Sequence, residues 1–213
     1  MSDSNSVDQG TKDAAREAAG SGQDIRELVR DITLKALTER RLDKERIKTV
    51  IKSVTDGVVE GVGENKEKLQ SSLKQAASGM DDALSKSAEA AKLATLEALG
   101  KASDFADNEF KEALKQLDGL EDLFIDTINK TAEQTSRLAN ESLKDLASHL
   151  KNTGTDAGRT AKEAVDTLTV DVSKLGKDAA KASVGASKEM GKQIADIASG
   201  ILSGMADALK RKD

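Results

Sequence analysis

The feature that most constrains the fold is an apolar stripe that repeats every eleven residues from Leu69 onward. Two tracks of apolar or small side chains, four residues apart, run through about thirteen repeats. The first is Leu69, Met80, Ala91, Ala102, Ala113, Phe124, Thr135, Leu146, Ala157, Leu168, Ala179, Met190 and Ile201, and the second is Leu73, Leu84, Thr95, Ala106, Leu117, Ile128, Ala139, Leu150, Ala161, Val172, Ser183, Ile194 and Met205. Eleven residues make three turns at about 3.67 residues per turn, so the stripe stays on one side of a nearly straight helix. The sequence therefore predicts long amphipathic helices whose apolar side packs against a partner.

The composition favours helix along almost the whole chain. The 213 residues include no proline, the commonest helix breaker, and alanine, lysine, glutamate and leucine are abundant. No run alternates β-branched or aromatic residues with polar ones, as a strand would. We predict an all-α protein of long amphipathic helices with an eleven-residue repeat, arranged as a helical hairpin or bundle. Because the stripe is rich in alanine and charged residues make up 33% of the chain, disorder of the isolated chain stays open.

The chain divides into three regions by composition. Residues 1–23 are small, polar and charged, and we expect a mobile N-terminal tail. Residues 24–63 concentrate arginine and larger apolar residues, and Asp24 and Asp43 are placed to cap two helices of an Arg-rich hairpin. Five apolar residues of this hairpin suit specific packing between chains, and we assign them to oligomerisation: Ile47, Val50, Ile51, Val54 and Val58. Residues 64–213 form the long-helix repeat region, with a turn at 152–158.

Within the repeat region we expect helices near 64–118, 120–151 and 156–210. Gly119 marks the first break, and Gly154 marks the second as a helix C-terminal glycine. The apolar face is widest around Leu93–Ile128, which predicts that this segment is the most deeply buried. The predicted interaction stripe consists of Leu69, Leu73, Met80, Leu84, Leu99, Phe105, Phe110, Leu117, Phe124, Ile128, Leu146, Leu150, Leu168, Val172, Ile194 and Ile201.

The sequence shows no arrangement of nucleophile and base, so we expect no catalytic, cofactor-binding or metal-ligating residues and no enzyme. His149, the single histidine, falls near the end of a predicted helix, where capping or an interface role outweighs catalysis. Gly57–Gly63 lacks the lysine and the preceding strand of a phosphate loop, so a fraying helix end is favoured. The turn Asn152–Asp156 is a capping turn or, less favoured, an anion site at a helix N-terminus. The basic end at Lys210–Lys212 compensates a helix dipole or attracts an anionic surface weakly.

Charge and hydropathy limit the partners. The net charge of −5 is spread along the chain and argues against nucleic-acid binding. The longest uncharged stretch, Ile197–Ala206, is about half of what a membrane span needs, so we expect no transmembrane segment. The first residues lack the pattern of a secretory signal, and cysteine is absent. We expect a cytoplasmic protein, peripheral on a granule or membrane surface at most.

Two strings carry a resemblance to known amphipathic-repeat proteins, at Ala88–Leu99 and at Ala179–Met190. They resemble group 3 late-embryogenesis-abundant proteins, the exchangeable apolipoproteins with the synucleins, and the bacterial phasins that coat polyhydroxyalkanoate granules. The Ile25–Val62 region and the turn from His149 to Asp156 are similar to a bacterial family of phasin-like helical proteins. The Arg-rich hairpin is unusual for a late-embryogenesis protein, and large apolar residues are sparse outside 93–128 for a lipid coat.

Two functional hypotheses follow. In the first, a non-enzymatic protein coats or binds a hydrophobic surface, such as a granule or a lipid surface, as the resemblance to phasins implies. In the second, the protein is a structural or stress-protective helical bundle or filament that acts by coiled-coil-like self-association. Both leave the partner unnamed, and both expect self-association.

Overall fold

The computed structural model describes residues 2–38, 43–63, 65–101 and 107–179, and it describes side chains over 8–38, 43–63, 65–96, 111, 113–170. These residues form α-helices joined by short connections, with no strand among them. The helices are α1 (Ser2–Gly20), α2 (Ile25–Thr38), α3 (Lys44–Val62), α4 (Lys66–Lys101), α5 (Asp107–Asp118), α6 (Leu120–Ala132), α7 (Arg137–Thr153) and α8 (Asp156–Ala179). The all-α prediction is confirmed.

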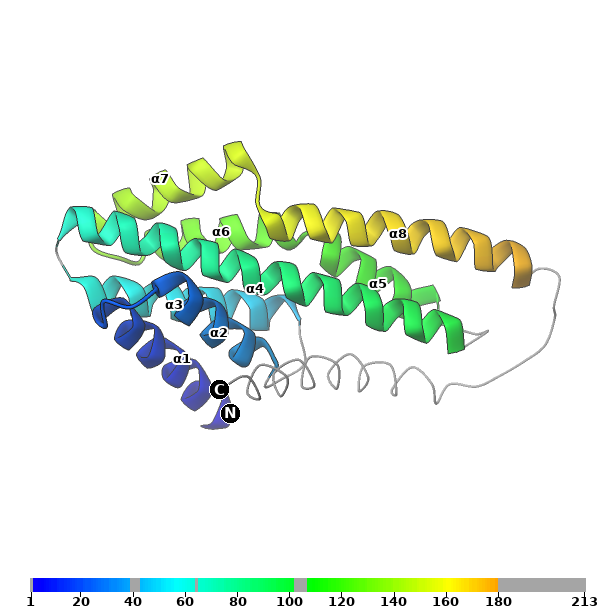
Figure 1. Ribbon diagram of the computed structural model, residues 1–213, viewed down its shortest axis with the longest axis horizontal. Coiled ribbons are helices and arrows are strands. Elements are labelled where there is room, and N and C mark those ends of the chain that lie inside the picture. Colours follow the sequence, from blue (N-terminus) through cyan, green and yellow to red (C-terminus); the bar gives the residue numbers. More distant parts are fainter. Residues whose placement is uncertain (1, 39–42, 64, 102–106, 180–213) are drawn as a thin grey trace.

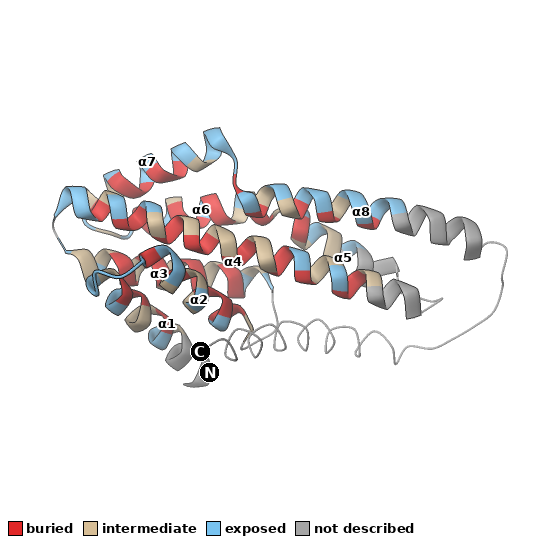
Figure 2. Cartoon of the chain, viewed as in Figure 1, coloured by how far each residue is buried: buried red, intermediate tan, exposed pale blue. Residues whose placement is uncertain are grey.

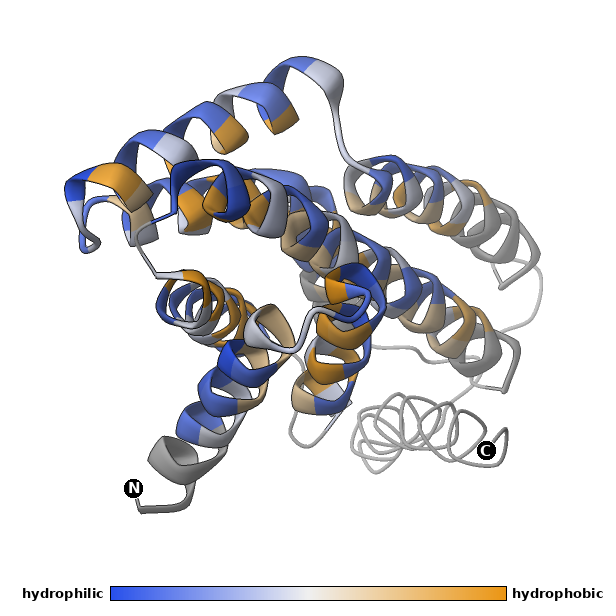
Figure 3. Ribbon diagram, turned by 60° about the vertical axis from the view of Figure 1, so that its left-hand side comes forward, coloured by the Kyte–Doolittle hydropathy of each residue, from blue (hydrophilic) through white to orange (hydrophobic). Residues whose placement is uncertain are grey.

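Helix α4 is the longest, at 36 residues, and the other helices are arranged around it (Figure 1). Helix α4 packs against α2, α3, α7 and α8, and the beginning of α8 lies at Asp81 and Ser85 of α4. Helix α1 lies against α3, which in turn contacts α6. One hydrophobic cluster runs from Ala15 in α1 to Leu168 in α8, so the three predicted regions share a core. Buried residues follow the inner sides of the helices (Figure 2), and each helix carries both hydrophilic and hydrophobic positions (Figure 3).

The first region differs from the predicted mobile tail, because Ser2–Gly20 forms helix α1. Ala15 and Ala18 of α1 are buried. Opposite them, Gly57 and Gly61 lie inside α3, where a Cβ would come within 2.2 and 2.3 Å of backbone oxygens of α1. Two glycines four residues apart let two helix backbones approach closely, and small alanines complete the contact. The glycines at 57 and 61 therefore serve helix packing, and the helix ends one residue before Gly63, whose φ is 70°.

The predicted caps of the Arg-rich hairpin are present. The Asp24 carboxylate accepts a hydrogen bond from the Glu27 backbone N–H at 3.2 Å, and Asp43 accepts one from the Arg46 N–H at 2.8 Å. The buried Arg46 side chain donates to the Ala36 carbonyl through Nε at 3.1 Å and Nη2 at 2.7 Å, and to the Asp8 carboxylate through Nη1. Arg46 thus ties the end of α2 and the beginning of α1 to α3.

The repeat region is divided more finely than the sequence predicted. The helix expected over 64–118 is α4 and α5, and the helix expected over 120–151 is α6 and α7, separated at 133–136. The Ala132 carbonyl at the end of α6 accepts hydrogen bonds from Thr135 Oγ1 at 2.8 Å and Asn140 Nδ2 at 2.7 Å. Polar side chains that satisfy a terminal carbonyl compete with helix continuation. Gly119 and Gly154 mark the breaks predicted for them, and residues 180–210 of the last predicted helix lie outside the described part.

We predict that Gly57→Ala and Gly61→Ala each lower the midpoint of thermal unfolding. The added methyl groups meet the backbone of α1, which has no side-chain freedom with which to move away. Overpacking costs about 1–3 kcal/mol, which exceeds the roughly 1 kcal/mol of helix propensity gained when alanine replaces glycine.

Gly10→Ala is the matched control, because Gly10 is helical and a Cβ there meets nothing within 4 Å. It should leave the midpoint unchanged or raise it. Equal effects at positions 10, 57 and 61 would show that the close crossing of α1 and α3 does not exist.

Candidate functional site

The predicted interaction stripe faces into the bundle wherever its side chains are described. Nine of its members are buried: Leu69, Leu73, Met80, Leu84, Leu117, Phe124, Ile128, Leu146 and Leu168. Leu150 is partly buried and packs against the same cluster. Leu99, Phe105, Phe110, Val172, Ile194 and Ile201 fall outside the residues whose side chains are described. In this structure the stripes of the separate helices therefore cover one another.

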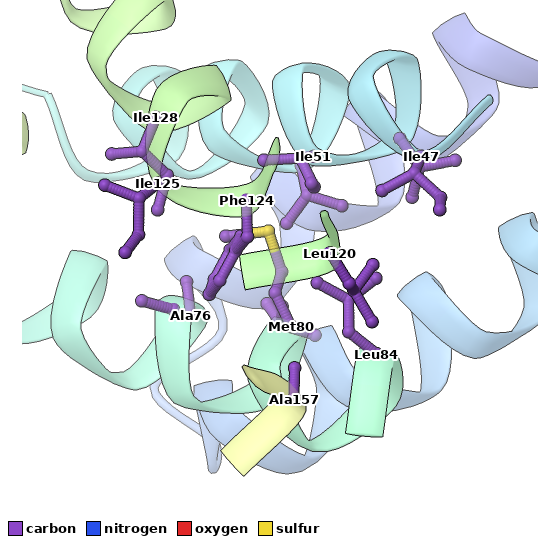
Figure 4. Close-up of a cluster of buried hydrophobic side chains, with 14 of the residues drawn as sticks. Ile47, Ile51, Ala76, Met80, Leu84, Leu120, Phe124, Ile125, Ile128 and Ala157 are labelled. Atoms are coloured by element: carbon purple, nitrogen blue, oxygen red, sulfur yellow. The ribbon is translucent and has the colours of Figure 1, made fainter. Parts of the chain in front are cut away.

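The centre of the stripe is a cluster between α3, α4, α6 and α8 (Figure 4). Phe124 of α6 is fully buried and lies with Met80 and Leu84 of α4 and Leu120 of α6. Ala157, at the beginning of α8, closes the cluster on one side. These contacts bring large apolar side chains of α3, α4 and α6 together, and their burial stabilises the fold.

The five hairpin residues assigned to oligomerisation belong to the same intramolecular core. Ile47, Val50, Ile51, Val54 and Val58 are all buried, with exposed fractions between 0 and 6%. Helix α3 contacts α1, α4 and α6, so its apolar side already has partners within the chain. This corrects the assignment to contacts between chains, which would need these side chains at the surface.

Within Leu93–Ile128, side chains are described over 93–96, at 111 and over 113–128, and these include both buried and exposed residues. Leu93 is 52% exposed, whereas Phe124 and Ile128 are fully buried. Near Leu93 the apolar residues of α4 cover more than one side of the helix. Ala90 and Ala94 face the bundle, and Leu93 lies on another side. The prediction that this whole segment is the most deeply buried is therefore wrong at Leu93.

Two carboxylates from other helices hold the beginning of α8. Asp81 of α4 accepts hydrogen bonds from the backbone N–H groups of Asp156 at 2.9 Å and Ala157 at 2.7 Å. Glu121 of α6 accepts from Thr155, through its N–H at 2.7 Å and its hydroxyl at 2.9 Å. We call these two carboxylates and their bonds the α8 clasp. Negative groups at a helix N-terminus are favourable because the free N–H groups and the helix dipole are positive there.

The clasp is completed by a hydroxyl and a glycine. The Gly158 N–H donates to Thr155 Oγ1 at 2.9 Å, so the free N–H groups of this turn have side-chain partners. A Cβ at Gly158 would lie 2.5–2.7 Å from the Glu121 carboxylate, so glycine leaves room for that group. The sequence predicted a capping turn at Asn152–Asp156. The structure shows one, whose caps come from α4 and α6 as well as from Thr155.

Burial raises the pKa of the Asp81 carboxyl above its ordinary value, although the two backbone N–H groups act in the opposite direction. The negative charges of Asp156 and Asp82 add to the increase. Beside them, Arg26 of α2 donates to Asp82 at 2.8 and 3.0 Å, and this pair raises the pKa of Arg26. The beginning of α8 is thus crowded with carboxylates.

The polar surface offers a groove of about 380 Å³ between α1, α3 and α6. It contains four lysines, of which Lys12, Lys48 and Lys52 each pair with a carboxylate at 2.6 Å. The neighbouring carboxylates offset the positive charge of these lysines and weaken their attraction for an anionic ligand. We interpret the groove as a solvated helix surface. His149 is exposed on α7 and faces a smaller depression with Lys74 and Asp145. Among the described residues, no three potential metal ligands come together.

A family model matches residues 1–211, and its description is a family of unknown function, DUF6781. The chain belongs to this family. Comparison with curated proteins and with solved structures finds no match. Within the described residues, no helix combines the length and apolar character needed to cross a membrane. The buried stripe and the α8 clasp are therefore the features that bear on function.

We predict that Phe124→Ala lowers the free energy of unfolding by about 3–5 kcal/mol, the cost of removing a ring from a packed core. Leu93→Ala, at an exposed position of the same repeat region, should change it by about 0.5 kcal/mol or less. Urea unfolding followed by circular dichroism measures both. Comparable losses at the two positions would contradict the burial described above.

We predict that Asp81 makes stability depend on pH. A raised pKa in the folded state means that the fold binds this proton more readily than the unfolded chain, so stability falls as pH rises through the folded pKa. The difference in unfolding free energy between wild type and Asp81→Ala should therefore grow in favour of wild type as the pH is lowered from neutral toward about 4. Urea titrations at several pH values measure it, and a difference that shrinks on acidification would refute the prediction.

Proposed function

We propose that this protein is a non-enzymatic, amphipathic-helix protein that binds or coats a hydrophobic surface in an open form of the bundle. The observation that supports the proposal most is the self-covered stripe. Separate helices bury their apolar sides against one another, and each side is a surface that lipid or polyester can cover instead. The polar sides of the same helices already face water and would do so in both forms.

The composition of the core fits such an exchange. Apolar burial contributes about 25 cal/mol per Å², whether the covering surface is protein or lipid. Alanine accounts for many of the buried residues: over 156–170, the part of α8 whose side chains are described, the buried apolar residues are Ala157, Ala161, Ala164 and Leu168, with Val165 partly buried. Small side chains interlock weakly, so complementary packing adds little to the stability of the closed bundle. An external apolar surface can therefore replace most of the stabilisation. Affinity for the surface then comes from the length of the helices, because many turns that each bind weakly act together.

The second candidate is a structural or stress-protective bundle that self-associates. The observation in its favour is the pair of exposed large apolar residues, Leu93 on α4 and Val170 on α8, each 52% exposed. The Ala157 N–H donates to the Asp81 carboxylate, and the Ser85 and Thr160 hydroxyls share a hydrogen bond, so α4 and α8 run in the same direction. Both exposed residues therefore lie beyond the clasp toward the same end of this helix pair, where a second chain would cover them.

We predict that the full chain binds phosphatidylcholine vesicles and polyhydroxybutyrate particles, measured by flotation. Since apolar contact drives the binding, the bound fraction should change little between about 50 and 500 mM salt, whereas charge-driven binding is screened over this range. Light scattering of the free protein provides the control for self-association. A monodisperse oligomer that melts cooperatively and floats with neither surface would support the second candidate and reject the first.

A further inference from the structure

Helix α1 has the smallest apolar side chains in its contact with the bundle. Over residues 8–20, where its side chains are described, the buried residues are Thr11, Ala15 and Ala18. Every other helix buries at least one valine, leucine, isoleucine or phenylalanine among its described side chains. Because burial of an alanine removes little apolar surface from water, the release of α1 sacrifices little apolar contact.

The surface of α3 that α1 covers is less suited to being uncovered. We call four residues of α3 the α1 docking surface: Arg46, Gly57, Glu60 and Gly61. When α1 leaves, Arg46, whose side chain is 7% exposed, loses its bond to the Asp8 carboxylate. The two glycines then expose helix backbone to water, which weakens α3. The energetic balance therefore favours a docking surface that holds an α1.

The contacts between α1 and this docking surface specify the occupant. The Asp8 carboxylate accepts a hydrogen bond from the docking-surface arginine, and Lys12 Nζ lies 2.6 Å from the Glu60 carboxylate. The third contact is small, because a Cβ on Gly57 would come within 2.9 Å of the Ala15 Cβ. An occupant therefore needs an acidic, a basic and a small residue at positions i, i+4 and i+7 of one helix. Helix α1 of a second copy meets this requirement fully.

The connection between α1 and α2 is held by local bonds. The Ser21 hydroxyl donates to the Ala18 carbonyl at 2.9 Å, and the Gln23 N–H donates to Ser21 Oγ at 3.2 Å. Residues 21–24 are exposed, and Gly22 has a φ of 71°. The tight turn of the closed chain thus depends on a conformation that glycine adopts readily. An extended connection would carry α1 away from its own α3.

We propose that the α1 docking surface mediates self-association, and that in a dimer each docking surface holds α1 of the other copy. Reciprocal exchange of an identical helix costs little, because the contacts of α1 with α3 and α2 are made again between the chains. The connection at 21–24 is the part that differs between the two forms. The balance between monomer and dimer therefore depends on protein concentration and on the conformation of Gly22. This inference is independent of binding to a hydrophobic surface.

Isotope mixing with a zero-length cross-linker tests the exchange on the full chain. Equal amounts of unlabelled protein and protein labelled with heavy nitrogen are unfolded together in urea, refolded at several concentrations and separated by size exclusion. A carbodiimide then joins the Lys12 amine to the Glu60 carboxylate, and mass spectrometry identifies the chains that are joined. In the dimer, random pairing predicts that about half of these cross-links join a labelled to an unlabelled chain. The monomer should give none.

The ion pair between Lys52 and Asp56 is the internal control for this measurement. Both residues lie in α3, and Lys52 Nζ is 2.6 Å from the Asp56 carboxylate. Exchange of α1 leaves this pair within one chain, so its cross-link should be unmixed in the monomer and in the dimer.

Gly22→Val should favour the dimer. A Cβ at position 22 meets nothing within 4 Å, so valine strains the backbone of the closed turn without a clash. The dissociation constant of the dimer should fall by about tenfold or more. Gly63→Val is the matched control, because Gly63 has a φ of 70° and equally open surroundings but connects α3 to α4. It should leave the mixed fraction of the Lys12–Glu60 cross-link as in wild type.

Three results would overturn the proposal. The first is a chain that stays monomeric at every concentration, in wild type and in Gly22→Val. The second is a wild-type dimer whose Lys12–Glu60 cross-links are all unmixed, which would place self-association on another surface, such as the exposed residues Leu93 and Val170. The third is an equal mixed fraction in Gly22→Val and Gly63→Val, with circular dichroism showing that both variants keep their helices. The wild-type measurement does not depend on the folding of either variant.

Discussion

The mutual burial of amphipathic helix faces is the constraint from which the rest of the structure follows. Helix α4 supplies the longest of these faces, and its neighbours α2, α3, α7 and α8 each cover part of it. Where large side chains meet, as at Phe124 and Met80, the core is fully closed. Where alanines meet, as along α8, the helices are close but the apolar contact is small. Stability is therefore distributed unevenly along a stripe that looks uniform in the sequence.

Polar contacts fix the relative positions of helices that the apolar stripe alone does not specify. Arg46 reaches the end of α2 and the beginning of α1 at once, and so fixes two helices on α3. Asp81 and Glu121 do the same for the beginning of α8. Such contacts matter because a uniform apolar stripe specifies register poorly, whereas a hydrogen bond to a helix terminus is directional. The helix N-terminus that suggested an anion site is occupied by carboxylates of the chain itself.

The two functional candidates use different surfaces and different states of the bundle. Binding to a hydrophobic surface requires the stripe to be uncovered. Self-association through the exposed residues Leu93 and Val170 leaves the bundle closed. The balance between them depends on how firmly the helices hold one another. Where alanines line the contact, as at Ala157, Ala161 and Ala164 of α8, the helices hold one another less firmly than leucine and phenylalanine would, and this is the physical reason to place exchange with an external surface first.

The sequence by itself determined the secondary structure class, the inward direction of the stripe side chains and several helix ends. Asp24, Asp43, Gly119 and Gly154 act through neighbours a few residues away, so local patterns were enough to find them. Four features came only from tertiary structure. Residues 2–20 become a helix on α3, because Gly57 and Gly61 make room for it from forty residues away. The break at 133–136 lies where two polar side chains return to a helix end.

The other two features that came only from the tertiary structure concern what particular side chains contact. The hairpin residues Ile47 and Val50 face the chain's own core, since composition alone does not distinguish an internal partner from an external one. No local pattern in the sequence distinguishes Asp81 and Glu121 from the other carboxylates, because their role depends on a helix that begins 75 and 35 residues later, at Asp156. Periodicity encodes which side of a helix is apolar. What covers that side, and which polar groups fasten it, depends on long-range contacts that no local pattern contains.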